Sequence, residues 1–139
     1  MMKGRYIVIV GCGRLGSLLA NRLSIQGANV VVVDRDTASF ENLSVGFSGF
    51  QVQGDVVEPE VLRRSKLADA DVLLAVTDDD NINLMVAQMA KKIHRVPRVI
   101  ARIYDPEREE LFHNLEIETL CPTRMAAERF FVLLELEIS

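Results

Sequence analysis

Short apolar runs and amphipathic segments alternate along the whole chain. Six short segments predict strands, at positions 6–10, 30–33, 50–53, 72–76, 98–102 and 117–120. The runs at 6–10 and 30–33 are continuously apolar, as is typical of strands buried on both faces, whereas the segment 50–53 is a weaker strand signal. The segments after them show helical spacing of apolar side chains, at positions 15–23, 37–44, 58–65, 82–93, 106–114 and 123–136. This order predicts an α/β fold, a Rossmann-like doubly wound parallel sheet of about six strands with right-handed crossovers.

Residues that start or stop helices mark several boundaries in this pattern. Gly27 follows the first helical segment at a natural C-cap position. Pro59 lies in the first turn of its helix, where proline is tolerated. We expect Thr123 to be the N-cap of the last helix, and the preceding Cys121 carries no signal of its own. In such a sheet a ligand binds at the carboxyl ends of the strands, where the strand order reverses.

Composition narrows the classes of function. With 139 residues, the chain has the length of about one domain. Its 16 basic and 20 acidic residues give a net charge of −4 and a pI near 5.2, which argues against binding of nucleic acid. The apolar runs are far shorter than the ~20 residues of a membrane span, so we expect no direct membrane insertion. Cys12 and Cys121 form no CxxC or metal-ligand pattern, which favours a reducing, cytoplasmic location.

A GxGxxG motif between the first strand and the first helix is the strongest local signal: Gly11-Cys12-Gly13-Arg14-Leu15-Gly16. Gly11 permits a tight turn, Gly13 lets a phosphate approach the backbone, and Gly16 lets the helix pack closely. The free N–H groups and the dipole of the helix N-terminus favour an anion. A thiolate at Cys12 would be favoured there too, but a small spacer between glycines is the preferred interpretation. The motif predicts a nucleotide phosphate site.

Charged residues beside the motif refine this prediction. Asp34 ends the second strand, at the spacing where an acid accepts hydrogen bonds from ribose hydroxyls. Its charge repels a 2′-phosphate, which favours NAD or a plain adenine nucleotide over NADP, although the adjacent Arg35 weakens this preference. Arg14 is either a bidentate ligand of a terminal phosphate or a solvated residue of the first helical turn.

Three acids follow the fourth strand at the same predicted edge. Thr77 is followed by Asp78, Asp79 and Asp80. These carboxylates fit three roles: contact with ribose, a hydrated divalent cation, or capping of the next helix, whose dipole favours acids in the first turn. We assign Thr77 and Asp78 to the nucleotide site and no residue to a metal site.

The ends of the third and fifth strands add further candidates. Gly54 and Asp55 follow the third strand, and the missing side chain of Gly54 leaves room for a flat adenine ring. Arg102 ends the fifth strand, and two roles are open for its side chain. It either reaches the phosphates of a nucleotide or forms a salt bridge with Asp105 or Glu109.

No pattern of catalytic residues accompanies these candidates. His94 and His113 are isolated from each other and from any acid cluster, so we expect them at helix ends or on the surface. An alternative function is the cofactor-binding domain of an NAD-dependent oxidoreductase, but the sequence has no Tyr-x-x-x-Lys pair and no His–acid pair for proton transfer. A redox-sensing regulator is disfavoured by the acidic charge and the lack of a DNA-binding segment. We therefore expect a protein without enzymatic activity.

The last helical segment is unusually apolar. Its polar residues are few, and the apolar stripe is too wide for a helix with one face on its own sheet. We therefore divide the chain into a nucleotide-binding part, 1–122, and an apolar helix, 123–139, that contacts another subunit. Burial of this helix within the domain is the alternative.

The motifs together resemble a known family, the N-terminal domain of RCK (regulator of K⁺ conductance) proteins of the Trk/Ktr type. The resemblance covers nearly the whole chain. It includes GCGRLG at 11–16, VVVVD at 30–34, QGD at 53–55 followed by Pro59 and Leu62, ADV at 70–72, and the segments 83–84, 90–92, 99–102 and 105–107. One departure is Ser65-Lys66, where the family commonly has Ala-Gly.

The resemblance implies a role for each candidate residue. Residues 11–16, including Arg14, would hold phosphates, Asp34 would bind ribose, and Asp55 would lie beside the adenine. Thr77, Asp78 and Arg102 would complete the site. The family binds ATP, ADP or NAD(H) without known turnover, so the implied cofactor is an adenine nucleotide (ATP, ADP or AMP) or NAD(H).

The resemblance also implies partners and a location. The family forms dimers that assemble into octameric rings, and its last helix often crosses onto a neighbour. We therefore expect a cytoplasmic gating subunit, peripheral to the inner face of the membrane, that binds the pore subunit of a potassium transporter or channel. It would form a homo- or hetero-oligomer with other RCK subunits. Many relatives continue into a second RCK lobe, which we do not expect in this chain.

Overall fold

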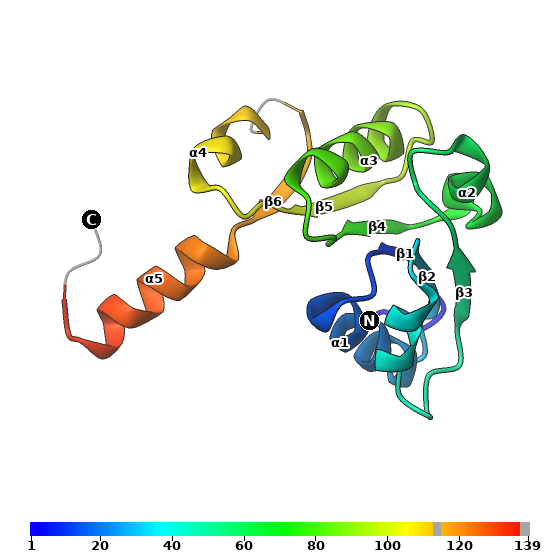
Figure 1. Ribbon diagram of the computed structural model, residues 1–139, viewed down its shortest axis with the longest axis horizontal. Coiled ribbons are helices and arrows are strands. Elements are labelled where there is room, and N and C mark those ends of the chain that lie inside the picture. The colour runs from blue at the N-terminus through cyan, green and yellow to red at the C-terminus, as the bar shows by residue number, and fades with distance from the viewer. Residues whose placement is uncertain (113–114, 137–139) are drawn as a thin grey trace.

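A single six-stranded parallel sheet, in the order β3-β2-β1-β4-β5-β6, organises the molecule (Figure 1). The computed structural model describes residues 1–112 and 115–136. The strands are β1 Tyr6–Val10, β2 Asn29–Asp34, β3 Phe50–Gln53, β4 Val72–Ala75, β5 Arg98–Arg102 and β6 Glu118–Leu120. The helices are α1 Arg14–Ile25, η1 Thr37–Asn42, α2 Pro59–Arg64, η2 Leu67–Asp69, α3 Asp80–Lys92, α4 Pro106–Glu109, η3 Glu110–Phe112 and α5 Pro122–Leu133. The predicted Rossmann-like, doubly wound fold is confirmed, and the strand order reverses between β1 and β4.

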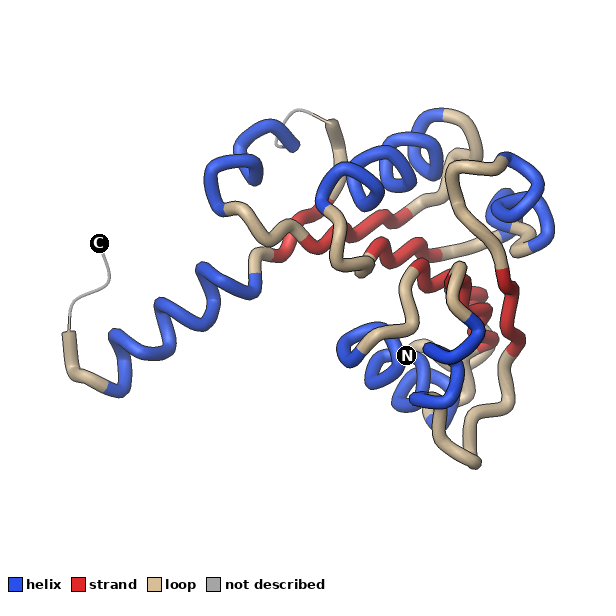
Figure 2. The backbone as a smooth tube through the Cα atoms, in the orientation of Figure 1, coloured by secondary structure: helices blue, strands red, loops and turns tan. Residues whose placement is uncertain are grey.

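Helices cover both faces of the sheet (Figure 2). The inner strands β1 and β2 are buried on both sides, whereas the edge strand β3 is largely exposed. Ile7 and Ile9 of β1 pack with apolar residues of α1 and η1, whereas Val8 and Val10 pack with those of α2 and α3. Successive side chains of a strand point to opposite faces. The continuous apolar runs in the sequence therefore reflect two separate packing layers.

The structure differs from the sequence-based expectation in several short segments. Residues 37–44 contain a 3₁₀-helix, η1, whose N-cap Asp36 accepts a hydrogen bond from the N–H of Ala38 at 3.0 Å. Short helical segments of this kind adopt the tighter 3₁₀ hydrogen bonding. The predicted helix at 106–114 is a four-residue α4 continued by η3, and its predicted end at 113–114 lies outside the described residues. β4 ends at Ala75, one residue earlier than expected.

The prediction of Thr123 as the N-cap of the last helix is wrong. The N-cap is Cys121, whose Sγ accepts the N–H of Arg124 at 3.5 Å. Pro122 then occupies the first helical position, where its fixed φ favours the helix and its missing N–H costs nothing. The helix therefore begins directly after β6.

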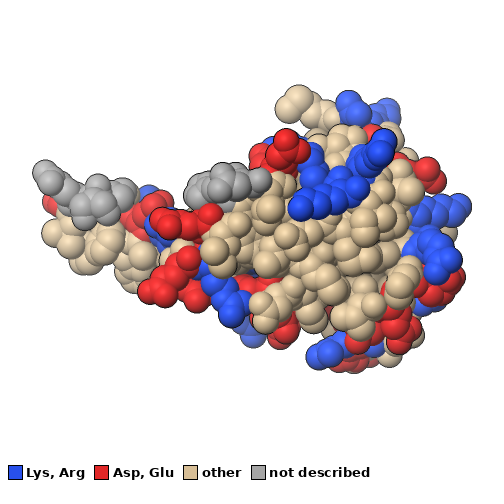
Figure 3. All heavy atoms as spheres, turned by 90° about the horizontal axis from the view of Figure 1, so that it is seen from above, with Lys and Arg blue, Asp and Glu red and all other residues tan. Residues whose placement is uncertain are grey.

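Helix α5 extends away from the sheet (Figure 1) and has no buried residue. Its exposed apolar side chains include Phe130, Phe131, Leu133 and Leu134. On the face of the molecule seen in Figure 3, Lys and Arg lie in separate groups among acidic and uncharged residues. Within residues 1–112 and 115–136, no helix is both long and apolar enough to cross a bilayer.

Candidate functional site

A cleft of about 750 Å³ opens at the carboxyl ends of β1 to β5. It lies at the point where the strand order reverses, as the topology predicts. The candidates that line it are Gly11, Gly13, Arg14, Leu15, Asp34, Arg35, Gly54, Asp55, Thr77, Asp78 and Arg102. Cys12 and Gly16, which were also candidates, lie behind the loop and do not line the cleft.

The glycine motif forms a turn in which two glycines are sterically required. Gly11 has φ +109°, and a Cβ there would lie 3.0 Å from the backbone N of Thr77. A Cβ on Gly16 would lie 1.8 Å from the carbonyl oxygen of Gly11, so this residue lets α1 approach the turn. Gly13, the N-cap of α1, faces open space, and no side chain caps the helix. The turn therefore leaves the N-terminus of α1 accessible to an anion.

Asp34 joins the glycine turn to the end of β2. Its Oδ2 accepts the N–H of Cys12 at 2.8 Å, and its Oδ1 accepts the N–H of Asp36 at 2.8 Å. Each carboxylate oxygen has two lone pairs, so both oxygens can accept a further hydrogen bond from a ribose hydroxyl. The neighbouring Arg35 is exposed at the same end of the cleft.

Cys12 fits the interpretation as a small spacer. Its side chain is buried in the apolar layer beneath α1. Burial, and to a lesser extent the negative charge of Asp34, raise the pKa of the Cys12 thiol to about 11. The thiolate that a helix N-terminus can favour is therefore suppressed at neutral pH.

The three acids after β4 have three different environments. Asp79 caps α3, since its Oδ1 accepts the N–H of Asn81 at 2.8 Å and of Ile82 at 3.2 Å. Asp80 accepts the N–H of Tyr104 at 2.8 Å and holds the loop after β5. Asp78 stays exposed and lines the cleft. Among the described residues, no group of three or more His, Cys, Asp or Glu could hold a metal ion.

Arg102 reaches the cleft without a carboxylate partner among residues 1–112 and 115–136. Its Nη2 donates to the carbonyl oxygen of Thr77 at 2.7 Å, and its guanidinium lies 4.6 Å from the centre of the Tyr104 ring. The alternative salt bridges do not form, because Glu109 pairs with Arg124 and Asp105 caps α4. The positive charge at the cleft is therefore available to an anion.

Gly54 and Asp55 line the cleft at the end of β3, whereas Arg102 lines it at the end of β5. Gly54 has φ +157°, and a Cβ there would lie 2.5 Å from Cγ2 of Val61, so only glycine fits between β3 and α2. Asp55 accepts the N–H of Val57 at 3.1 Å and is half-buried at the cleft. A shallow polar hollow lined by Glu58 and Arg64 continues beyond them.

Several lining residues were missed in the sequence, among them Asp36, Ser39, Ile82 and Tyr104. Tyr104 lies two residues beyond the end of β5, so its position at the ligand edge could have been inferred. Ser39 comes from η1, whose place over the cleft depends on how the chain returns from β2 to β3. No local pattern indicates that return.

Comparison with known sequences identifies relatives over most of the chain. The sequence model of the TrkA-N domain family matches residues 7–122. The Trk system potassium uptake protein TrkA of Streptomyces coelicolor is 41% identical over 124 residues, which are 89% of this chain and 56% of that protein. A TrkA homolog of Pyrococcus horikoshii is 30% identical over 132 residues, 91% of this chain and 58% of that protein. The chain thus spans little more than half the length of these relatives.

Solved structures share the fold. The TrkA-N domain of the inner membrane protein ybaL from Escherichia coli superposes with a TM-score of 0.82 at 19% identity, over 96% of this chain and 99% of that one. The GsuK channel bound to NAD superposes with a TM-score of 0.80 at 23% identity. The match covers 94% of this chain and 23% of that one. The AMP-bound C-terminal domain of Kef from Shewanella denitrificans superposes with a TM-score of 0.79 at 20% identity. The match covers 94% of this chain and 80% of that one.

Proposed function

This chain belongs to the TrkA-N domain family, and on that premise we propose that it is a nucleotide-binding regulatory domain of a potassium transport system. The curated relatives are potassium uptake proteins of the Trk system. The bound nucleotide would favour one conformation of the assembly over another. A ligand can shift such an equilibrium only by its difference in affinity for the two states.

The arrangement of charges along the cleft carries the nucleotide proposal. For phosphates, the cleft offers the N-terminus of α1, which no side chain caps, and the side chains of Arg14 and Arg102, which line the same cleft. It offers the carboxylate of Asp34 for ribose hydroxyls at the end of β2. Phosphate next to ribose is the order of groups in a nucleotide. Gly54 and Asp55 would then lie beside the adenine.

The ligand we propose is ATP, ADP, AMP or NAD(H). Structures with this fold are described as bound to NAD or to ADP in the GsuK channel, and to AMP in Kef. Asp34 disfavours NADP, because its negative charge would lie near a 2′-phosphate. We propose that binding occurs without turnover, as befits a regulatory subunit of potassium uptake. The cofactor domain of an NAD-dependent oxidoreductase remains the competing function.

The exposed helix α5 supports the proposed partners. Its Phe130 and Leu133 are each 65% exposed. A large apolar surface of this kind is typical of an interface. We propose that α5 packs on another RCK subunit, identical or related, in a ring of up to eight domains, and that the ring binds the pore subunit at the cytoplasmic face of the membrane.

Isothermal titration of the purified, nucleotide-stripped protein tests the proposal. ATP, ADP, AMP, NAD and NADH would be titrated in turn, and each mixture assayed for products. Binding of adenine nucleotides that depends on phosphate number, with no product, supports the gating domain. Binding of NAD(H) alone with oxidation of a small substrate would favour the oxidoreductase instead.

A further inference from the structure

Asn83 is a buried amide that joins the ends of two strands at the cleft. It lies in the first turns of α3 with none of its surface exposed. Its Oδ1 accepts the N–H of Thr77 at 3.0 Å and the hydroxyl of Thr77 at 2.6 Å. Its Nδ2 donates to the carbonyl oxygens of Thr77 at 3.0 Å and of Arg102 at 2.9 Å. One side chain thus fixes the residue that follows β4 and the residue that ends β5.

The same contacts fix the direction of the Arg102 side chain. Arg102 is held by Asn83 at its backbone carbonyl and by the carbonyl oxygen of Thr77 at its Nη2. That carbonyl oxygen is itself bonded to Nδ2 of Asn83. The Nε atom of Arg102 is buried and has no partner within the described part of the chain. A long, flexible side chain is therefore restrained before any ligand binds.

The first turn of α3 also holds the loop that carries Tyr104. Asp80 accepts the backbone N–H of Tyr104, whose ring lies 4.6 Å from the guanidinium. Cation–π contact of this kind favours one orientation of the guanidinium. Asn83 thus holds the backbone of Thr77 and Asp80 holds the backbone of Tyr104, and these are the two residues that the Arg102 guanidinium contacts.

The side-chain amide of Asn83 supplies both the acceptor and the two donors that this position uses. Aspartate has no N–H to donate to the two carbonyl oxygens, and serine is too short to join both strands. A buried carbonyl left without a donor carries a free-energy penalty. Since Arg102 would contact phosphates, the amide acts on the ligand through another residue.

We propose that Asn83 is a positioning residue, which presents the Arg102 guanidinium to the phosphates of a bound nucleotide. The proposal rests on the nucleotide-binding function proposed above. Preorganisation lowers the entropy lost when a flexible side chain binds a ligand. Asn83 therefore contributes to the affinity for phosphates and not to the affinity for the nucleoside.

Titration of ADP and adenosine separates this role from a general effect on folding. We expect Asn83→Ser to weaken ADP binding about tenfold and to leave adenosine within about twofold. The matched control is Val86→Ala, which creates a cavity on the same helix at a fully buried residue. It should leave both affinities within about twofold. In an Arg102→Gln background, Asn83→Ser should cause no further loss of ADP affinity.

A spectroscopic measurement tests the positioning without a nucleotide. The Nε–H of Arg102 should give a separate ¹⁵N–¹H resonance, assigned by its loss in Arg102→Gln. It should move toward the resonances of exposed arginines in Asn83→Ser and stay in place in Val86→Ala. If Asn83→Ser does not fold, Thr77→Val removes one hydrogen bond to Oδ1 and should shift the resonance in the same direction.

Equal losses of ADP and adenosine affinity, or an unchanged Arg102 resonance, would overturn the proposal. A wild-type protein that binds neither ligand would overturn the nucleotide-binding function instead. The resonance of Arg102 would then decide by itself whether Asn83 positions the guanidinium.

Discussion

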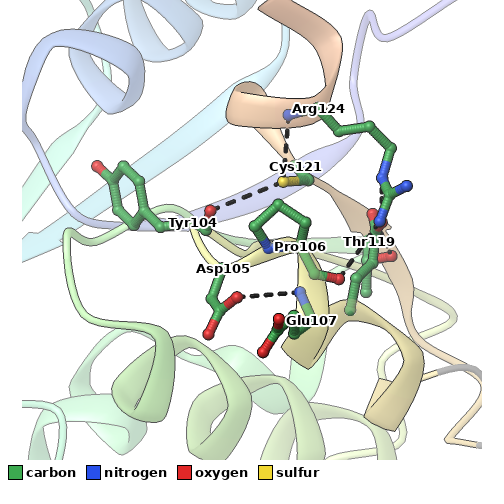
Figure 4. Close-up of polar contacts among 8 residues, drawn as sticks. Tyr104, Asp105, Pro106, Glu107, Thr119, Cys121 and Arg124 are labelled. Atoms are coloured by element: carbon green, nitrogen blue, oxygen red, sulfur yellow. Dashed lines mark hydrogen bonds and ion pairs between the residues drawn. The ribbon is translucent and has the colours of Figure 1, made fainter. Parts of the chain in front are cut away.

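The thiol of Cys121 donates to the carbonyl oxygen of Tyr104 across 3.8 Å, and so connects a cleft residue to the start of α5 (Figure 4). Arg124 reinforces this connection, since its Nε donates to Glu109 at 3.0 Å and its Nη2 to the carbonyl oxygen of Pro106 at 3.3 Å. Thr119 of β6 also donates to Glu109, at 3.3 Å. The exposed helix is therefore anchored at its first turn to the loop that leaves the cleft.

Replacing Cys121 should destabilise the start of α5. In Cys121→Ala the N–H of Arg124 loses its acceptor, and we expect the free energy of unfolding to fall by about 1 kcal/mol. Cys121→Ser is the matched control, because a hydroxyl caps a helix well. Urea denaturation measures both. Equal losses in the two variants would show that the cap contributes nothing.

An added methyl group should lower the stability of the protein at Gly16 and its affinity for ADP at Gly13. Gly16→Ala places a Cβ against the carbonyl oxygen of Gly11, so we expect a loss of stability of about 3 kcal/mol or more. Gly13→Ala meets open space, so the protein should fold normally. It should nevertheless bind ADP at least about tenfold more weakly, since the methyl group occupies the phosphate position. Thermal unfolding and titration with ADP separate the two effects, and full ADP affinity in Gly13→Ala would contradict the phosphate site.

Arg14 and Asp34 should affect different parts of the ligand. Arg14→Ala should weaken ATP by about tenfold or more and AMP much less, because it removes a charge-assisted contact with the terminal phosphate. Asp34→Ala should weaken every adenosine ligand, since it removes the ribose acceptor and frees the N–H of Cys12. Calorimetric titration of both variants gives the affinities. If Arg14→Ala weakens ATP and AMP equally, Arg14 does not recognise phosphate number.

The thiol of Cys12 should make stability sensitive to alkaline pH. Burial raises the pKa of this thiol from 9.0 to about 11, so the folded protein favours the neutral form. This contribution is complete below the unfolded pKa and is lost as the pH rises through the folded pKa. We expect the stability of the wild type to fall more steeply than that of Cys12→Ala between about pH 9 and 11. Urea denaturation at several pH values measures the two slopes, and parallel slopes would contradict the raised pKa.

The association proposed for α5 predicts a change in molecular mass. Phe130→Asp combined with Leu133→Asp introduces charge on two exposed apolar positions. We expect a shift toward monomer without loss of the fold, because α5 contributes no buried residue. Sedimentation equilibrium gives the mass, and circular dichroism checks the fold. Glu128→Asp on the same helix is the control. A double variant with the wild-type mass would exclude α5 as the interface.

Much of the fold was predictable from the sequence because its signals are local. Each of the six predicted segments coincides with a strand, and the bounds of β1, β3 and β5 agree with the prediction. The glycine motif and Asp34 were recognisable because the steric demand of a tight turn and the end of a strand both act over a few residues. Once the strands are parallel, their carboxyl ends share one edge. That geometry brought the predicted residues 11–16, 34 and 54–55 to the same cleft, apart from Cys12 and Gly16.

Only the tertiary structure decided which partner each polar group finds. The sequence could not distinguish the roles of Asp79 and Asp80, because the second depends on a loop more than twenty residues away. It gave no role to Asn83, whose amide bonds both a neighbouring turn and the end of β5. It assigned the last N-cap to Thr123, where the structure has Cys121. Local patterns determine where strands and helices form, but a buried polar group must be satisfied by whatever the folded chain places within hydrogen-bond distance.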